Sequence, residues 1–470
     1  MTTAFRNVAT LVRAWAIVLL SAHVLTSVAT AVVQRGSAAS GSVGSTVTPT
    51  FTTEAHSSSD GSGIAYNSAT NSVTISGANP LLIACWHAEF GGAEGATLWY
   101  WTATYNGVAG RMFVITNGYT GGTANTLLRC YYWTAPAAGA HNLIVRRNDA
   151  AGDIINNANE LAVAAILING AAQTFYPFRD VAVDVSTNTR TSETVTVNSA
   201  ATDLVVHVIA PSLTAQGTLG AGETSRSWAN DGSDDASVWF STKAGGASST
   251  TVSSSGWAST FPIQGIAFSV LGAAEAETTT NFTDTYVRAN ESPLSKSGVW
   301  TSPVGNVTIT KIDVVSNQAK GNTAAENLAM VNSPSFPANQ RARMTYVGAT
   351  YGGVGVRMTS AAVASGYLLS TSGAGTLQVL KITDGGASES YSQIGADINL
   401  ARNLVAGDVI ELQATGTSTT TLNVYWNQML VGARTDSSSP FTSGRPFVRV
   451  FGAAASDSGF EATSLPVRLP

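Results

Sequence analysis

Short hydrophobic runs, each ended by Gly, Ser, Asn or Asp, recur along most of this chain. Several runs alternate hydrophobic and polar residues, as SVTISG at 72–77 and ETVTVN at 193–198 do. Successive side chains of a β-strand point to opposite faces, so this period of two predicts strands with one buried face. Many short strands separated by turn residues are typical of a β-sandwich or barrel, and we predict an all-β protein.

Other runs are hydrophobic throughout and do not alternate. LLIACW at 81–86 reads as an apolar strand, and VAAILI at 163–168 reads as a buried strand. The second run lies in a stretch of helical composition, NNANELAVAAILING at 156–170. A buried strand and a buried helix share such a pattern, so both assignments stay open for 156–170.

A change of composition divides the chain into two domains. The segment GAAEAETTTN at 272–281 is small, acidic and rich in threonine, and we predict an interdomain linker at 274–280. We therefore expect two β-sandwich, jelly-roll-like domains in tandem, at 34–273 and 281–470. Turn signals occur in both domains, at Asn106-Gly107, Asn117-Gly118, Asp231-Gly232 and Asp384-Gly385.

The first 33 residues have a different pattern. Arg6 and Arg13 precede an apolar stretch that ends in small residues at Ala29-Thr30-Ala31. This order is typical of a secretory signal peptide, and a membrane anchor stays open as the alternative. LTSVATAVVQ at 25–34 also alternates well enough to be a first strand.

The chain carries unusually little charge. Charged residues make up 11% and hydrophobic residues 44%, with a formal net charge of -5. Globular proteins usually contain about 25% charged residues, so the surface must be neutral and rich in hydroxyl groups. Nucleic-acid-binding proteins carry clustered Lys and Arg, which this chain lacks, so we expect no nucleic-acid partner.

The two cysteines, Cys85 and Cys130, both lie in apolar runs that read as strands. If those strands are neighbours, one disulfide is compatible with an extracellular protein. Two buried free thiols are the alternative, and the sequence does not decide between them.

Residues 281–470 resemble the concanavalin A-like, laminin-G-like jelly rolls of secreted bacterial and phage tail proteins. The segments that carry the resemblance are TDTYVRANESPLSKSGVWTSP at 283–303, KIDVVSNQAKG at 311–321 and the long hairpin region at 407–452. The hairpin has Asn427-Gln428 where the family usually shows Asn-Gly. A type I′ turn favours Gly at that second position, so this turn is expected to be strained or of another type.

Residues 60–273 resemble bacterial and phage surface β-sandwich modules. NPLLIACWHAEF at 79–90 and FPIQGIAFSVLG at 261–272 carry the resemblance, and the most specific run is Tyr132 to His141, YWTAPAAGAH. Such modules are generally appended to larger surface or tail proteins. The resemblance transfers no catalytic residue to this chain.

The sequence gives no sign of a catalytic site. His87 and His207 lie among apolar strand residues, where a structural role is expected, and no HExxH, GxSxG or phosphate-binding motif occurs. A retaining glycosidase needs two carboxyl groups about 5–5.5 Å apart, whereas Glu389 and Glu411 each stand alone in their strands. We therefore expect no enzyme and no cofactor.

Two further kinds of binding site can be considered. The acidic run Asn230 to Asp235 lacks the spacing of a calcium loop, so we predict a solvated turn and no metal site.

Aromatic rings can stack on sugars, which makes Trp99, Trp101, Tyr131 and Trp133 weak candidates for ligand binding. Alternate residues of a strand point inward, so most of these rings are expected to pack in the core.

Together these observations predict a non-enzymatic, surface-displayed structural or adhesion protein. A phage virion or tail-associated component that contacts a cell surface fits best, located extracellularly or on a virion. Its partners would be a cell-surface glycan or neighbouring structural subunits, and a homo-oligomer stays open. The alternative is a secreted carbohydrate-binding protein or cell-surface adhesin, and a hydrolase is the weakest candidate.

Overall fold

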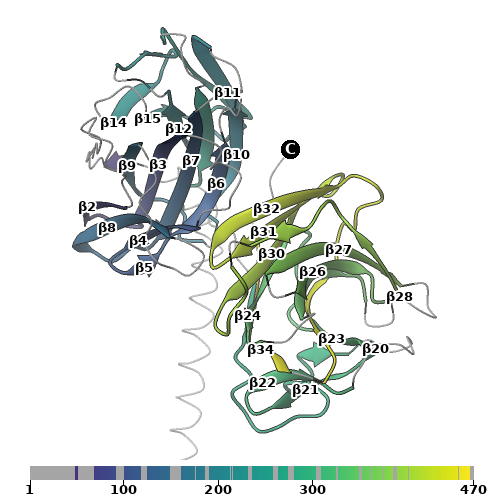
Figure 1. Ribbon diagram of the computed structural model, residues 1–470. Helices are drawn as coiled ribbons and strands as arrows, with labels where there is room; N and C mark the ends of the chain where they lie inside the picture. The colour runs from purple at the N-terminus through teal and green to yellow at the C-terminus, as the bar shows by residue number, and fades with distance from the viewer. Residues whose placement is uncertain are drawn as a thin grey trace, which may run out of the picture. The chain divides into compact units, whose positions relative to one another are not determined.

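The computed structural model contains β-strands and turns throughout the part of the chain that it describes (Figure 1). The described residues are 48–50, 68–91, 100–117, 124–148, 160–174, 176–185, 190–211, 213, 215–230, 236–257, 263–273, 280–302, 309–323, 326–348, 352–360, 363–373, 375–384, 389–400, 402–453 and 455–465. Within these ranges, no helix is long and apolar enough to cross a membrane. The all-β sandwich class predicted from the sequence is confirmed.

Residues Thr46–Pro470 form one compact unit. The segment at 1–33, with its predicted signal or anchor, lies outside the described residues, as do 274–279 of the predicted linker. Both predicted sandwich domains therefore contribute to the single unit Thr46–Pro470.

Strands between residues 48 and 270 form sheets that we name after one strand in each. The β8 sheet has the order β2 (Ser68–Ile75), β8 (Gly139–Asn148), β4 (Tyr100–Tyr105), β5 (Val108–Ala109). The β3 sheet has the order β1 (Thr48–Thr50), β9 (Glu160–Asn169), β3 (Leu81–Gly91), β7 (Ala124–Thr134), β6 (Arg111–Asn117). The β12 sheet has the order β10 (Phe178–Val185), β17 (Gln264–Val270), β12 (Leu204–Ala210), β15 (Ser237–Ala244), β14 (Thr224–Asn230). The β16 sheet has the order β11 (Ser192–Asn198), β16 (Ser249–Ser255), β13 (Thr218–Leu219).

These sheets pack face to face in the order β8, β3, β12, β16, and we call the assembly the stack. One face of the β3 sheet packs on the β8 sheet through residues such as Leu82 and Val145. Its other face packs on the β12 sheet through residues such as Ile83 and Val206. Val205 on the far face of the β12 sheet then packs against the β16 sheet. The first half of the chain thus holds more layers than a single sandwich.

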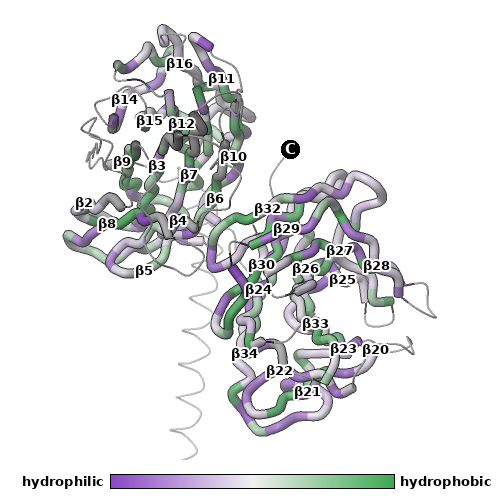
Figure 2. Tube along the Cα trace, viewed as in Figure 1, coloured by the Kyte–Doolittle hydropathy of each residue, from purple (hydrophilic) through white to green (hydrophobic). Residues whose placement is uncertain are grey.

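The position of a sheet in the stack explains its hydrophobic pattern. Every residue of β12 and of β17 is buried, because both faces of their sheet are covered. In the outermost β16 sheet, buried and exposed residues alternate along β11, because only one face is covered. Figure 2 shows how the hydropathy of the residues is distributed over these strands. The run at 163–168, left open between helix and strand, belongs to β9.

The remaining strands form a jelly-roll-like sandwich of two sheets. The β24 sheet has the order β21 (Ile312–Val315), β22 (Gln318–Gly321), β34 (Ala455–Ser464), β24 (Gln340–Tyr346), β30 (Val409–Thr415), β31 (Thr420–Trp426), β32 (Met429–Asp436), and β18 (Asn281–Asp284) also pairs with β34. The β25 sheet has the order β19 (Trp300–Thr301), β23 (Glu326–Val331), β33 (Arg445–Phe451), β25 (Gly353–Met358), β26 (Gly366–Gly373), β27 (Thr376–Asp384), β28 (Glu389–Gln393), with β20 (Ile309–Thr310) on β23 and β29 (Ile398–Asn399) on β27. Buried residues such as Leu412, Val424 and Leu369 form the core of this sandwich.

Candidate functional site

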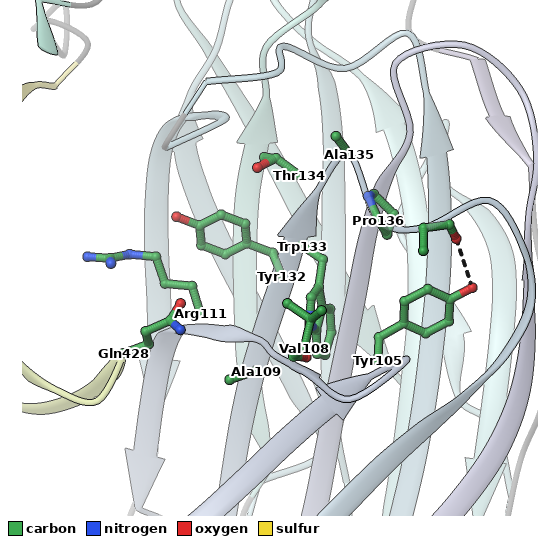
Figure 3. Close-up of a pocket in the computed structure, with 11 residues that line it drawn as sticks. Tyr105, Val108, Ala109, Arg111, Tyr132, Trp133, Thr134, Ala135, Pro136 and Gln428 are labelled. Atoms are coloured by element: carbon green, nitrogen blue, oxygen red, sulfur yellow. Dashed lines mark hydrogen bonds between the residues drawn. The ribbon is translucent and has the colours of Figure 1, made fainter. Parts of the chain in front are cut away.

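A cavity of about 250 Å³ lies beside β4, β5 and the end of β7 (Figure 3). Its lining is mainly aromatic, aliphatic and proline side chains: Tyr105, Val108, Ala109, Arg111, Tyr132, Trp133, Thr134, Ala135, Pro136, Ala137 and Gln428. Pockets for drug-sized ligands usually have about 300–1,000 Å³, so this cavity is suited to a small group such as a single ring.

A tight turn and a close approach of the backbone shape the cavity. The predicted turn at Asn106-Gly107 connects β4 to β5, and both residues have positive φ, 49° and 74°. It places Val108 at the rim with 61% of its surface exposed. Gly110 lies under Trp133, where a Cβ atom would be 2.4 Å from the indole Cζ2. A larger residue at 110 would displace the indole ring.

The polar atoms of the two main rings are occupied within the protein. Trp133 Nε1 donates to the carbonyl of Val108 at 2.9 Å. The hydroxyl of Tyr105 lies 3.1 Å from the carbonyl of Gly139 and 3.2 Å from that of Ala137. These bonds fix both rings. Only 1% of Tyr105 and 5% of Trp133 is exposed, so a ligand in the cavity would meet apolar ring edges rather than polar atoms.

Arg111 is the charged residue in the cavity lining, and its charge is neutralised by Glu411. The guanidinium NH1 lies 3.1 Å from Glu411 Oε2, and NH2 contacts Oε1. The ring of Tyr425 is 4.3 Å from the guanidinium carbon, which adds a cation–π contact. Both charged side chains are buried, so Arg111 is held in this ion pair inside the protein.

Glu411 belongs to a larger ion-pair network. Its Oε2 lies 3.1 Å from Arg341 NH1, and Arg341 also contacts Glu461, which in turn contacts Arg343. Burial alone would raise the pKa of Glu411, but Arg111 and Arg341 outweigh it and lower this pKa to about 2. The carboxylate that looked isolated in the sequence is therefore held charged by arginines distant along the chain.

The turn at Asn427-Gln428 also reaches the cavity. The carbonyl of Gln428 accepts a hydrogen bond from the N–H of Met112 at 3.1 Å, and Gln428 is part of the cavity lining. Both turn residues have positive φ, 48° and 69°, as a type I′ turn requires. Asn427 Nδ2 donates to Asp408 at 2.7 Å, which fixes this turn although its second residue is not Gly.

The four aromatic candidates from the sequence have different positions. Trp133 and Tyr131 are both buried in the core between the β3 and β8 sheets, and Trp133 also lines the cavity. Trp99 lies outside the described residues, and Trp101 is on β4 with a side chain that is also outside them. Sequence reasoning missed Tyr105, Arg111, Pro136 and Gln428 as cavity residues. The available signal was the specific run at 132–141, which supplies much of the lining.

Cys85 and Cys130 form a disulfide between β3 and β7. The two residues are direct partners in the strand register, with their Cα atoms 4.2 Å apart. Of the two alternatives that the sequence left open, the structure contains the disulfide. It joins two central strands of the sheet that carries Trp133 and Arg111.

His207 is enclosed between two carboxylates in the stack. Its Nε2 lies 2.9 Å from Glu193 and its Nδ1 lies 2.9 Å from Glu223, and the three side chains have no exposed surface. Ser241 and the N–H of Ser253 also donate to Glu223. Because the cluster is closed to solvent and hydrogen-bonded internally, it is suited to holding the β12 and β16 sheets together rather than to catalysis.

The other histidine expected to be structural is hydrogen-bonded across the stack. His87 on β3 accepts a hydrogen bond from the N–H of Ser237 on β15 at 3.2 Å. No group of three or more His, Cys, Asp or Glu residues suited to a metal ion occurs in the described ranges. The acidic run at 231–235 lies outside them.

No family model matches this chain, and neither does any curated protein. Among solved structures, the chain is similar to a human SPRY domain at 14% identity, with a TM-score of 0.22, over 34% of this chain and 97% of that chain. It is also similar to an apo Crh5 transglycosylase at 9% identity, with a TM-score of 0.23, over 39% of this chain and 83% of that chain. At such TM-scores these similarities carry no argument about function.

Because carboxylates surround His207, we expect the free energy of unfolding to fall as the pH rises above neutrality. Burial lowers the pKa of His207, but hydrogen bonds and charges from Glu193 and Glu223 outweigh it, so the net pKa is raised. The stabilisation is complete below the ordinary histidine pKa of about 6.5 and is lost as the pH rises through the raised value. The pKa of Glu223 is lowered, so its contribution is instead lost in acid.

Urea unfolding at about pH 6 and about pH 9 checks this prediction. His207→Gln should cost about 3–5 kcal/mol at the lower pH and should make the decrease between the two pH values smaller. The partly exposed His141→Gln is the control and should keep that decrease. An unchanged pH dependence in His207→Gln would contradict the assignment.

The Arg111–Glu411 pair generates a second prediction. Glu411→Gln leaves Arg111 buried without a carboxylate and removes one of the two carboxylates that contact Arg341, so the free energy of unfolding should fall by about 3–5 kcal/mol. Glu461→Gln is the matched control, because that carboxylate is partly exposed and its loss should cost about 1 kcal/mol or less. Chemical denaturation measures both variants, and equal losses would rule out a special role for the buried pair.

Proposed function

We propose that this protein is a non-enzymatic, surface-displayed structural or adhesion protein that contacts a neutral glycan. A phage virion or tail-associated component is the assignment we favour. The single observation that supports it most is the cavity at Tyr105, Trp133 and Pro136, which combines fixed rings with one charged lining residue, Arg111, that is already ion-paired. Sugar rings pack their apolar faces on such side chains, and a neutral site favours a neutral sugar over an acidic one.

The rest of the chain is compatible with display at a surface. Only 11% of its residues are charged, so much of its polar surface must consist of hydroxyl and amide groups. A disulfide between Cys85 and Cys130 suits an oxidising, extracellular environment. The resemblance of 281–470 to concanavalin A-like, laminin-G-like domains supports the same assignment, since such domains are common in secreted and phage tail proteins.

A binding role is favoured over a catalytic one by the state of the titratable groups near the cavity. Glu411 is buried between Arg111 and Arg341, so neither Glu411 nor Arg111 is available as an acid, a base or a nucleophile. The hydroxyl of Tyr105 points to backbone carbonyls. The second candidate, a secreted carbohydrate-binding protein or adhesin, would use the same cavity and differ in where the protein is displayed.

A charge at the rim of the cavity tests the proposal. Val108→Asp places a carboxylate beside the rings, and its desolvation should weaken the binding of neutral oligosaccharides about tenfold or more. Val287→Asp is the matched control, since Val287 is a valine with 72% of its surface exposed and is absent from the lining. Binding is measured on an array of neutral, acidic and sulfated oligosaccharides.

The expected result is retention on neutral oligosaccharides by the wild type and by Val287→Asp, with loss in Val108→Asp. Equal binding by both variants would remove the cavity from the proposal. Release of shortened oligosaccharides during the assay would contradict the non-enzymatic assignment.

A further inference from the structure

The outward face of the β16 sheet consists of hydroxyl and amide side chains. Along β11, inward residues Val195 and Val197 are buried and the alternate residues are exposed. We call the outward set the hydroxyl face: Ser192, Thr194, Thr196, Asn198, Thr218, Ser249, Thr251, Ser253 and Ser255. It contains no charged, aromatic or aliphatic side chain.

The strand register orders these side chains in rows. Thr194 lies opposite Ser253 and Thr196 opposite Thr251, while Asn198 lies opposite Ser249. The hydroxyls of Thr196 and Thr251 are 2.9 Å apart and hydrogen-bonded. Neighbouring rows are about 6.8 Å apart along the strands, and paired strands are about 4.8 Å apart. The result is a repeating array of hydrogen-bonding groups.

Three charged side chains at the margin of this face hydrogen-bond to its backbone and remain partly exposed. Asp180 accepts from the N–H of Asn198 at 3.0 Å, and Asp184 accepts from that of Thr194 at 3.4 Å. Lys243 donates to the carbonyl of Thr251 at 2.9 Å. The two aspartates occupy backbone groups along β11, which closes that edge against the addition of another strand.

Size and charge restrict what this face can bind. Its strands span roughly 10 Å by 20 Å, on the order of 200 Å², whereas a stable protein interface needs about 800 Å² per partner. The absence of basic side chains on it disfavours nucleic acid and acidic polymers. Its polarity disfavours an apolar partner. A narrow, uncharged and hydroxyl-rich chain matches it in each respect.

We propose that the hydroxyl face binds an extended, neutral polysaccharide chain, as a second contact surface distinct from the cavity. This inference deepens the proposed function and rests on it, because both assign neutral glycans as the partner. A protein hydroxyl that replaces a hydrogen bond to water by one to a sugar gains little net free energy. Binding of a single polysaccharide chain should therefore be weak, whereas binding to a surface that presents many such chains should be strong.

The test is affinity electrophoresis of the full chain in gels containing hydroxyethylcellulose, a neutral extended glucan. Replacing Thr194, Thr196 and Thr251 together by Val keeps side-chain shape and strand propensity while removing the hydroxyls. We expect retardation to weaken about tenfold in this triple variant, because three hydrogen-bonding groups are lost. The triple Thr→Ser variant keeps the hydroxyls and should restore the retardation.

The other outer sheet provides a matched control. Thr70 and Thr74 on β2 are exposed in the same setting, but the outward face of that sheet also carries Ile144 and Arg146. Thr70→Val with Thr74→Val should therefore leave the retardation unchanged. An unretarded wild type, an unchanged Thr194/Thr196/Thr251 valine variant or an equal loss in the control would each overturn the inference.

Val108→Asp separates this inference from the proposed function. We expect it to lose oligosaccharide binding at the cavity while keeping its retardation in the glucan gel. If Val108→Asp loses array binding and the triple valine variant is retarded like the wild type, the cavity assignment survives and the hydroxyl face is rejected.

Discussion

The apolar contact between the β3 and β12 sheets is the interaction on which the rest of the stack depends. Phe113, Phe178 and Phe268 meet there, with ring centroids 4.5–5.3 Å apart. The β3 and β12 sheets are each covered on both faces. Each is therefore buried partly by the other and partly by an outer sheet, the β8 sheet or the β16 sheet. The outer sheets can then leave one face exposed each, and in the β16 sheet that face consists of hydroxyl and amide side chains.

The sequence predicts the outer strands better than the order of the layers. ETVTVN alternates because only one face of β11 is buried, and Asn106-Gly107 forms the turn that its residues favour. VAAILI could not be assigned from its period, since burial on both faces removes the polar positions that reveal a strand. For the same reason, the run at 81–86 indicates burial but not which sheets cover it.

The cavity shows a different limit. Trp133 could be predicted as a candidate because it is an aromatic residue within the specific run at 132–141. Arg111 and Glu411 could not be predicted as a pair, because 300 residues separate them in the sequence. No local pattern connects such a pair, and each residue alone reads as an ordinary strand position. The same holds for His207, whose partners Glu193 and Glu223 come from β11 and from the segment before β14. Sequence patterns report one strand at a time, while these sites are made by packing between strands.

Native-state hydrogen exchange of the amides in β3, β9, β12 and β17 tests the central contact most directly. If the β3 and β12 sheets stabilise one another, these amides should exchange only by unfolding of the whole stack, with one shared free energy. Exchange from β12 and β17 at a clearly lower free energy than from β3 and β9 would contradict the account. It would show two separable sandwiches instead of one cooperative stack.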